Sequence, residues 1–169
     1  MCWISNNLPV AKEAEKDKVV LKVLHRERLM LPGSNGEKSV IRYTSPVMNF
    51  PYTLGVEYEE KIIIEKPYYD YSINNGLHCY SDKIHFKYET ENFDMCNYII
   101  VMGTHSHITY RDSDFKKVVL MKCIIPKGTY YYENENGEIV SHKLKIIGEI
   151  PIRLFNENKY IKGEKLCVG

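Results

Sequence analysis

Apolar positions along this chain fall into short runs and alternations that are separated by polar turn residues. The near-continuous apolar runs at 97–103 and 116–125 are typical of strands at the centre of a sheet. Segments rich in β-branched residues at 18–26, 39–44 and 56–66 predict three further strands. The last of these is expected to continue without a break from Val56 to about Lys66.

Turn signals divide the second half of the chain. Asn-Asn-Gly before 77–81 tolerates positive φ and predicts a turn into a short strand. Pro-Lys-Gly-Thr at 126–129 and Glu-Asn-Glu-Asn-Gly at 133–137 predict two tight turns around a hairpin that leads into a strand at 143–150.

Three segments have less definite patterns. At 82–95, Ile84 and Tyr88 have helical spacing but also belong to an alternation, and we expect a helix or a helical turn there. The polar stretch 104–115 is expected to be a loop or a sheet edge. Segments 152–155 and 165–169 are expected to add short strands at the end of the sequence.

Together these segments predict a β-rich fold, all-β or strand-dominated α+β. We expect one compact domain of about eight to ten short antiparallel strands with at most one or two helices. A length of 169 residues suits a single domain. Residues 1–17 are polar and mixed in charge, so they are expected to form an N-terminal arm anchored by Trp3, with the domain at 18–169.

Charge and cysteine usage restrict the function classes. The 23 Lys and Arg residues nearly balance the 22 Asp and Glu residues, and no basic block stands out, which disfavours long nucleic acid as a partner. Five cysteines without a C-x-x-C pair indicate reduced thiols. With no basic-apolar leader and no apolar run of membrane-spanning length, we expect a cytoplasmic protein that does not enter a membrane.

Tyrosine is the strongest bias in the composition, with 14 residues. Tyrosine favours strands and supplies rigid amphipathic contact surface. The excess therefore fits a β-rich fold with a tyrosine-lined pocket or interface. No phosphate loop, dinucleotide motif or esterase elbow is present in the sequence, and no cofactor is expected.

The most concentrated polar stretch is "THSHITYRD". If it is extended, His105, His107, Thr109 and Arg111 share one face and could hold a phosphate or a carboxylate by charge-assisted hydrogen bonds. Metal binding, phosphoester chemistry and plain ligand binding are the functional alternatives. The alternative that implies no function is a solvated polar loop.

Two family resemblances bear on this stretch. H-x-H followed by Asp112 resembles the first cupin motif, and "PKGTYYYEN" resembles the second, although Tyr131 stands where that motif has a histidine. "HIT" at 107–109 resembles one half of the paired signature of 2H phosphoesterases, in which two histidines act as acid and base. His78 is the nearest candidate for a second histidine, but its serine lies one place too far along. No metal ligand is assigned.

Two further strands contribute candidate ligand-binding residues. On 77–81, His78 and Tyr80 alternate to one side while Leu77 and Cys79 are expected to pack inward, so His78 and Cys79 do not form a reactive pair. In "RYTSP", an arginine stands among aromatic residues. Arg42 could clamp a phosphate while the Tyr43 ring stacks on a base.

Much of the chain resembles small proteins of Bacteroidetes and their phages to which no chemistry is assigned. The stretches that carry the resemblance are "MCW", "SPVMNFPYTLGVEY", "NGLHCYS" and "IIPKGTYYYENENGEIVSHKLKIIGEI". A phage setting implies, by analogy, an anti-defence protein that sequesters a nucleotide-derived signal in the host cytoplasm without cleaving it.

The sequence therefore predicts a non-catalytic, homo-oligomeric protein that binds a small nucleotide-like ligand. The expected ligand-binding residues are Arg42, Tyr43, His78, Tyr80, His105, His107, Thr109 and Arg111. One alternative is a phosphoesterase or ADP-ribosyl-processing enzyme that uses His107 and His78 as acid and base. A second alternative is a protein-binding inhibitor or a structural phage component.

Overall fold

The computed structural model describes residues 3–32, 38–82, 84–92, 95–102, 106–113 and 115–151, with the backbone alone for 85–92, 95–102 and 106–110. These residues form strands and no helix, which confirms the β-rich fold class. The described residues form sixteen strands, more than the eight to ten expected, and several of them are only two or three residues long. Within the described part of the chain, no helix is long and apolar enough to cross a membrane.

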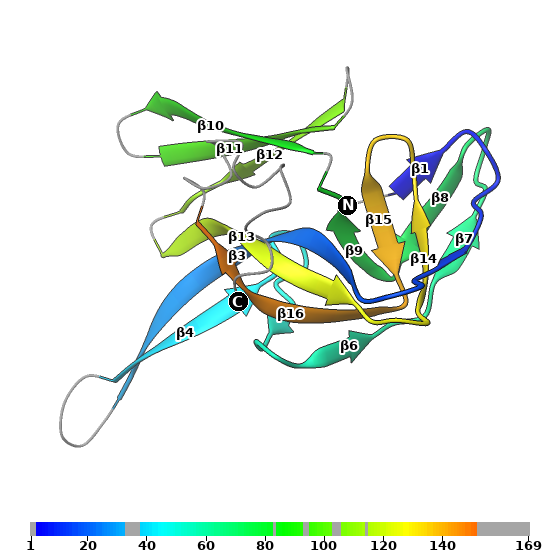
Figure 1. Cartoon of the computed structure of the whole chain (residues 1–169). Coiled ribbons are helices and arrows are strands. Elements are labelled where there is room, and N and C mark those ends of the chain that lie inside the picture. Colours follow the sequence, from blue (N-terminus) through cyan, green and yellow to red (C-terminus); the bar gives the residue numbers. More distant parts are fainter. Residues whose placement is uncertain are drawn as a thin grey trace.

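The strands form one large sheet and two three-stranded sheets, and every pairing is antiparallel (Figure 1). The main path of the large sheet runs, in spatial order, through β2 (Lys12–Glu13), β14 (Tyr130–Glu133), β15 (Glu138–Ser141), β9 (Leu77–Tyr80), β3 (Lys18–Leu31), β13 (Lys116–Ile125), β16 (Lys143–Ile150) and β6 (Glu57–Glu59). Beside this path, β4 (Lys38–Thr44) pairs with β3, and β5 (Pro51–Tyr52) pairs with β4.

The large sheet curls around one hydrophobic core. Strands along its whole width contribute to the same buried cluster, from Ala14 and Tyr131 at one end, through Cys79 and Leu24, to Leu144 near the other. Strand alternation explains this, because every second residue of β3 and β13 points to the same face. The face that carries Val20, Leu24, Val119 and Met121 is therefore turned toward this core. The opposite face of β3 and β13 also buries apolar side chains, namely Leu21, Val23, Val118 and Leu120.

A small sheet of β1 (Trp3–Ser5), β8 (Tyr71–Asn75) and β7 (Ile63–Glu65) lies against the outer side of β15. Trp3 and Ile73 pack there on Val140, and the Trp3 indole nitrogen donates to the carbonyl oxygen of Glu138 at 3.0 Å. The segment expected as an arm thus has Trp3 buried, and strand β2 of the same segment pairs with β14.

The other small sheet consists of β10 (His85–Asn92), β11 (Met95–Met102) and β12 (Ser106–Arg111). The helix predicted at 82–95 is wrong, because residues 85–92 form β10, which pairs with the apolar strand β11. The stretch expected as a loop or edge contains β12, which is an outer strand of this sheet.

The continuous strand predicted at 56–66 is also wrong. β6 pairs with β16, whereas β7 pairs with β8 in the small sheet. Between them the Glu60 amide donates to the carbonyl oxygen of His142 at 2.9 Å, and the chain leaves the large sheet there. The hairpin of β14 and β15 is confirmed. The strands expected at 152–155 and 165–169 lie outside the described residues.

Candidate ligand-binding site

A cavity opens where β3 changes its neighbour. Along one edge β3 pairs with β4 from His25 to Leu31, but at Leu21 it pairs with β9. Lys22 and Val23 lie between these partners and line a cavity of about 590 Å³. Its walls come from β3, the β4–β5 loop, β5, β6, β8 and β9: Lys22, Val23, Ser45–Met48, Phe50, Tyr52, Tyr58–Glu60, Asn74–His78 and Tyr80. The volume lies within the usual range of small-ligand pockets, about 300 to 1,000 Å³.

Lys22 supplies a buried cation to this cavity. Its side chain is only 8% exposed, and its ammonium group donates a hydrogen bond to the carbonyl oxygen of His78. The same nitrogen lies 5.3 Å from the centre of the Tyr52 ring, within the range of a cation–π contact. Burial lowers the pKa of Lys22, while the nearby Glu60 carboxylate opposes this shift. An anionic group that entered the cavity would stabilise the ammonium.

Three aromatic rings form one wall. Phe50, Tyr52 and Tyr58 contact one another edge to face, with ring centroids 5.0 to 5.9 Å apart. The Tyr58 hydroxyl accepts a hydrogen bond from the Thr53 amide at 2.7 Å, which fixes that ring. Burial raises the pKa of Tyr52, so its phenol stays protonated at neutral pH. The wall offers the apolar surfaces of three mutually tilted rings, two of which carry phenol hydroxyl groups.

His78 lies in the wall on β9 and is neutral at pH 7. Burial lowers its pKa to about 4, and the nearby Lys22 charge adds to that shift. His78 Nε2 lies 3.3 Å from the carbonyl oxygen of Asn74. Because a carbonyl oxygen only accepts, Nε2 carries the proton, and Nδ1 is left as the acceptor of the neutral ring. The histidine therefore offers directional hydrogen bonding rather than charge.

The outer rim is apolar and is shaped by the loop between β4 and β5. Ser45 closes this loop, since its amide donates to the carbonyl oxygen of Phe50 at 2.9 Å and its hydroxyl accepts from the Phe50 amide at 3.0 Å. Val47 and Met48 at the loop tip are largely exposed. Both side chains line the cavity together with Lys22.

The two cysteines near the cavity are structural. Cys79 and Cys123 are free thiols that are completely buried in the core. Burial raises the pKa of Cys79 to about 12 and also raises that of Cys123. Because the thiolate is the nucleophilic form, neither residue is poised for reaction at neutral pH. Leu77 and Cys79 pack inward as predicted.

No known protein family, curated protein or solved structure matches this chain. Within the described part of the chain, no three His, Cys, Asp or Glu side chains are grouped so that they could hold a metal ion.

The structure brings two of the predicted ligand-binding residues together. His78 and Tyr80 both line the cavity. Arg42 and Tyr43 lie outside it on β4, each held by a carboxylate. Arg42 donates to Glu27 at 2.6 Å, and the Tyr43 hydroxyl donates to Glu149 at 2.9 Å.

The remaining predicted residues belong to another part of the chain. His107 and Thr109 are in β12, where the backbone alone is described, and His105 lies outside the described residues. Arg111 ends β12 as an exposed residue, and its carbonyl oxygen lies 3.2 Å from Nε2 of His25. Arg111 does not line the Lys22 cavity.

Sequence reasoning missed Lys22, Tyr52 and Tyr58. One signal was available for Lys22, which interrupts the apolar run "VVLKVL" of a central strand. A lysine inside such a run is rare unless it has partners. The tyrosines carried no comparable signal, because their place depends on the loop that brings β5 and β6 to β3.

Proposed function

We propose that this protein binds a small anionic, nucleotide-like ligand in the Lys22 cavity and holds it without converting it. The observation that carries the proposal is the buried ammonium group of Lys22 in a cavity walled by aromatic rings. Small-ligand sites typically combine apolar walls with a few placed polar groups.

The groups around the cavity match the parts of a nucleotide. The Lys22 ammonium would bind a phosphate, and the rings of Tyr52 and Tyr58 would contact a base. The Glu60 carboxylate also lines the cavity. Carboxylates are common acceptors for ribose hydroxyls in dinucleotide sites, so Glu60 fits a sugar rather than a second phosphate.

In the phage setting that the sequence resemblance implies, the ligand would be a defence signal and the mechanism sequestration. The host cytoplasm would then be the place of action. The buried free thiols of Cys79 and Cys123 suit such a reducing compartment. His78, as a neutral ring, would supply hydrogen bonds and no charge to the bound signal.

The first experiment is a thermal-shift panel with cyclic di-AMP, cyclic di-GMP, ADP-ribose and cyclic ADP-ribose. A ligand that binds only the folded state stabilises it by RT ln(1 + L/Kd), where L is the free ligand concentration, and therefore raises the Tm. The protein is then incubated with each positive compound and heat-denatured, and the released compound is identified by mass spectrometry. Release of intact compound supports sequestration, whereas a changed product contradicts it.

The same experiment separates the alternatives. A phosphoesterase that uses His78 and His107 would give a changed product. That mechanism requires both histidines to face one phosphorus, and they belong to β9 and β12 of different sheets. If no compound shifts the Tm, the nucleotide proposal fails and a protein-binding role gains support.

A further inference from the structure

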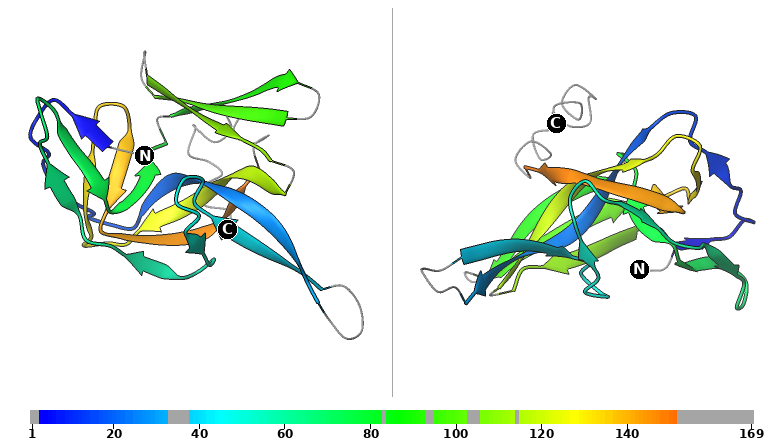
Figure 2. Two further views of the ribbon diagram at one scale, coloured as in Figure 1. Left: turned by 180° about the vertical axis from the view of Figure 1, so that it is seen from behind. Right: turned by 90° about the horizontal axis from the view of Figure 1, so that it is seen from below.

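Strand β7 is the last strand of the small sheet of β1, β8 and β7, and its outer edge is free. It pairs with β8 on one side only. Within the described residues, the main chain of 61–66 forms no hydrogen bond outside that pairing. The hairpin of β7 and β8 lies at the margin of the molecule (Figures 1 and 2). A free strand edge presents N–H and C=O groups to which another strand can bind.

Apolar side chains stand on this open edge. Ile63 and Ile64 are 41% and 39% exposed, whereas Ile62 before them packs against the hydrophobic cluster under the small sheet. The run of three isoleucines is bounded by Lys61 and Glu65, which are both exposed. β-Branched residues favour strands, and an exposed apolar run on a free edge is typical of a segment that another strand covers.

The residues around Ile63 are self-complementary for antiparallel pairing. The sequence of 61–65 is Lys-Ile-Ile-Ile-Glu, with one isoleucine and then one charged residue on each side of Ile63. When two antiparallel copies meet with Ile63 opposite Ile63, each Ile62 faces Ile64 of the other copy, and each Lys61 faces Glu65. Residues that face each other across an antiparallel pair point to the same side of the sheet, so every one of these pairs can make contact.

The two charges at the ends of this run have no counter-charge within the described part of the chain. Lys61 forms no ion pair there. Glu65 accepts a hydrogen bond from the side-chain amide of Asn74 at 3.0 Å, which leaves its charge uncompensated. Both groups are therefore available to a second chain.

Two-fold symmetry selects one register. In an antiparallel pair of identical strands the axis passes through the middle of the pairing, so one residue has to face its own copy. A pairing centred on Ile62 would put Lys61 opposite Ile63, and one centred on Ile64 would put Glu65 opposite Ile63. Both place a charge against an isoleucine. The register centred on Ile63 alone matches apolar with apolar and lysine with glutamate.

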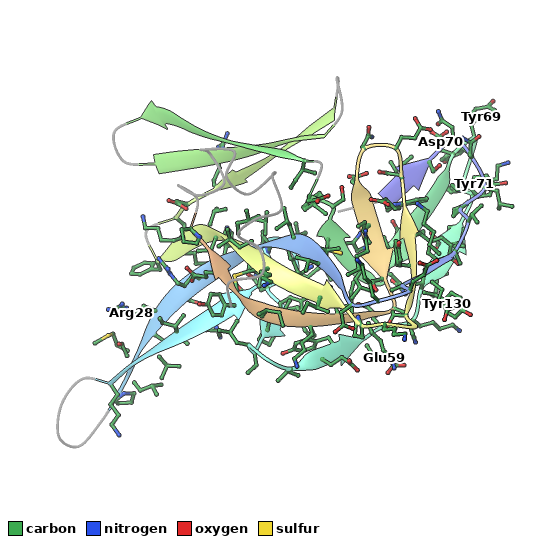
Figure 3. The ribbon with its side chains drawn as sticks, viewed as in Figure 1. Arg28, Glu59, Tyr69, Asp70, Tyr71 and Tyr130 are labelled. Atoms are coloured by element: carbon green, nitrogen blue, oxygen red, sulfur yellow. The ribbon has the colours of Figure 1, made fainter. Side chains whose placement is uncertain are left out.

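The tip of the hairpin offers further contact surface. Tyr68 and Tyr69 are 85% and 91% exposed, and Figure 3 shows Tyr69 at the outer margin of the molecule. Because the two strands would run antiparallel, the residues after Lys66 of one copy would pass beyond Lys61 of the other. Tyrosine is enriched in protein interfaces, since its rigid amphipathic ring supplies a large contact area at low entropic cost.

We propose that two copies of this chain form a two-fold dimer by pairing their β7 strands antiparallel, with Ile63 at the axis. The two three-stranded sheets then join into one sheet across the axis through main-chain hydrogen bonds. Lys61 of each copy pairs with Glu65 of the other. Since the paired segment is short, the association is reversible rather than obligate. The dimer does not depend on the ligand of the Lys22 cavity.

Charge-swap variants of the full chain test this pairing by sedimentation equilibrium. Lys61→Glu puts a carboxylate opposite Glu65, and Glu65→Lys puts an ammonium opposite Lys61, twice in each dimer. Each single variant should dissociate roughly tenfold or more readily than wild type, because like charges then face each other. The double variant, which carries both changes, should dimerise as wild type does, because its exchanged charges are again complementary. An equimolar mixture of the two single variants should form a heterodimer for the same reason.

Lys38→Glu is the control, because it makes the same change of charge at an exposed residue of β4, which lies far from β7 (Figure 1). It should leave the dimer intact. Circular dichroism verifies that each variant is folded. Wild type that stays monomeric up to millimolar concentration overturns the proposal, as does a dimer that neither single variant weakens. Dissociation of both single variants without recovery in the double variant and in the mixture shows that Lys61 and Glu65 do not face each other, and overturns it as well.

Discussion

The ammonium group of Lys22 donates a hydrogen bond to the main-chain oxygen of His78, a residue 56 positions further along the chain. This contact ties β3 to β9 at the point where β3 exchanges one neighbour for another. Two consequences follow for the cavity. Its cation is fixed in position by the main chain, and its histidine is kept neutral by burial and by the adjacent charge.

The neutral state of His78 predicts a loss of stability in mild acid. Burial lowers the pKa of the folded residue from 6.5 to about 4. Between these values the unfolded chain binds a proton that the folded chain does not, so stability present above pH 6.5 declines as the pH falls. The loss from this residue should reach at most about 3 kcal/mol.

Urea unfolding of wild type and His78→Gln between pH 7 and pH 4.5 measures this effect. The variant should show a smaller decline over that range. Burial also lowers the pKa of His25, but that residue is present in both proteins, so the difference between them isolates His78. Equal slopes would show that His78 titrates alike in the folded and unfolded chains.

Gly76, at the edge of the cavity, should be intolerant of any side chain. Its φ of +116° is unfavourable for other residues, and an added Cβ would lie 2.4 Å from Cγ1 of Val140. Gly76→Ala is expected to destabilise the fold by roughly 2 to 5 kcal/mol through strain and overpacking. Gly55 also has positive φ but meets open space, so Gly55→Ala should cost about 1 to 2 kcal/mol. Equal losses in chemical denaturation would contradict the steric explanation.

The contacts of Trp3 should make strand β1 part of the cooperatively folded domain. Trp3 is 1% exposed, and its indole donates to Glu138, 135 positions away in the sequence. Trp3→Ala is expected to cost about 3 to 5 kcal/mol, whereas Trp3→Phe should retain most of the packing and lose mainly one hydrogen bond. Guanidinium unfolding followed by circular dichroism compares the two. An unchanged midpoint for Trp3→Ala would show that β1 is dispensable.

The sequence predicted the strands whose local pattern was unambiguous. The alternation and turns around β14 and β15, and the apolar run of β13, each indicated one structure. Residues 85–92 fitted both a helical and an extended period. The adjacent strand β11 decides between them, because it offers β10 a hydrogen-bonded partner along its length.

The break between β6 and β7 has a tertiary cause. No glycine or proline marks it, and the chain turns away from β16 where Glu60 bonds to His142. The sequence predicted the candidate site only at His78 and Tyr80, which share one strand, although Lys22 stands out as a lysine within an apolar run. Lys22 becomes part of the cavity through β9 and β5, which lie far along the chain, and no local pattern encodes that arrangement.

The Lys22 ammonium is the centre of the proposed binding site, and calorimetric titration tests its role most directly. The nucleotide of the panel that gives the largest Tm shift is titrated into wild type, Lys22→Met and Arg42→Met. Loss of a charge-assisted hydrogen bond predicts that Lys22→Met binds about 10- to 100-fold more weakly. Arg42→Met, outside the cavity, should bind as wild type does. Unchanged affinity in Lys22→Met, or lost affinity in Arg42→Met, would contradict the assignment of this cavity as the binding site.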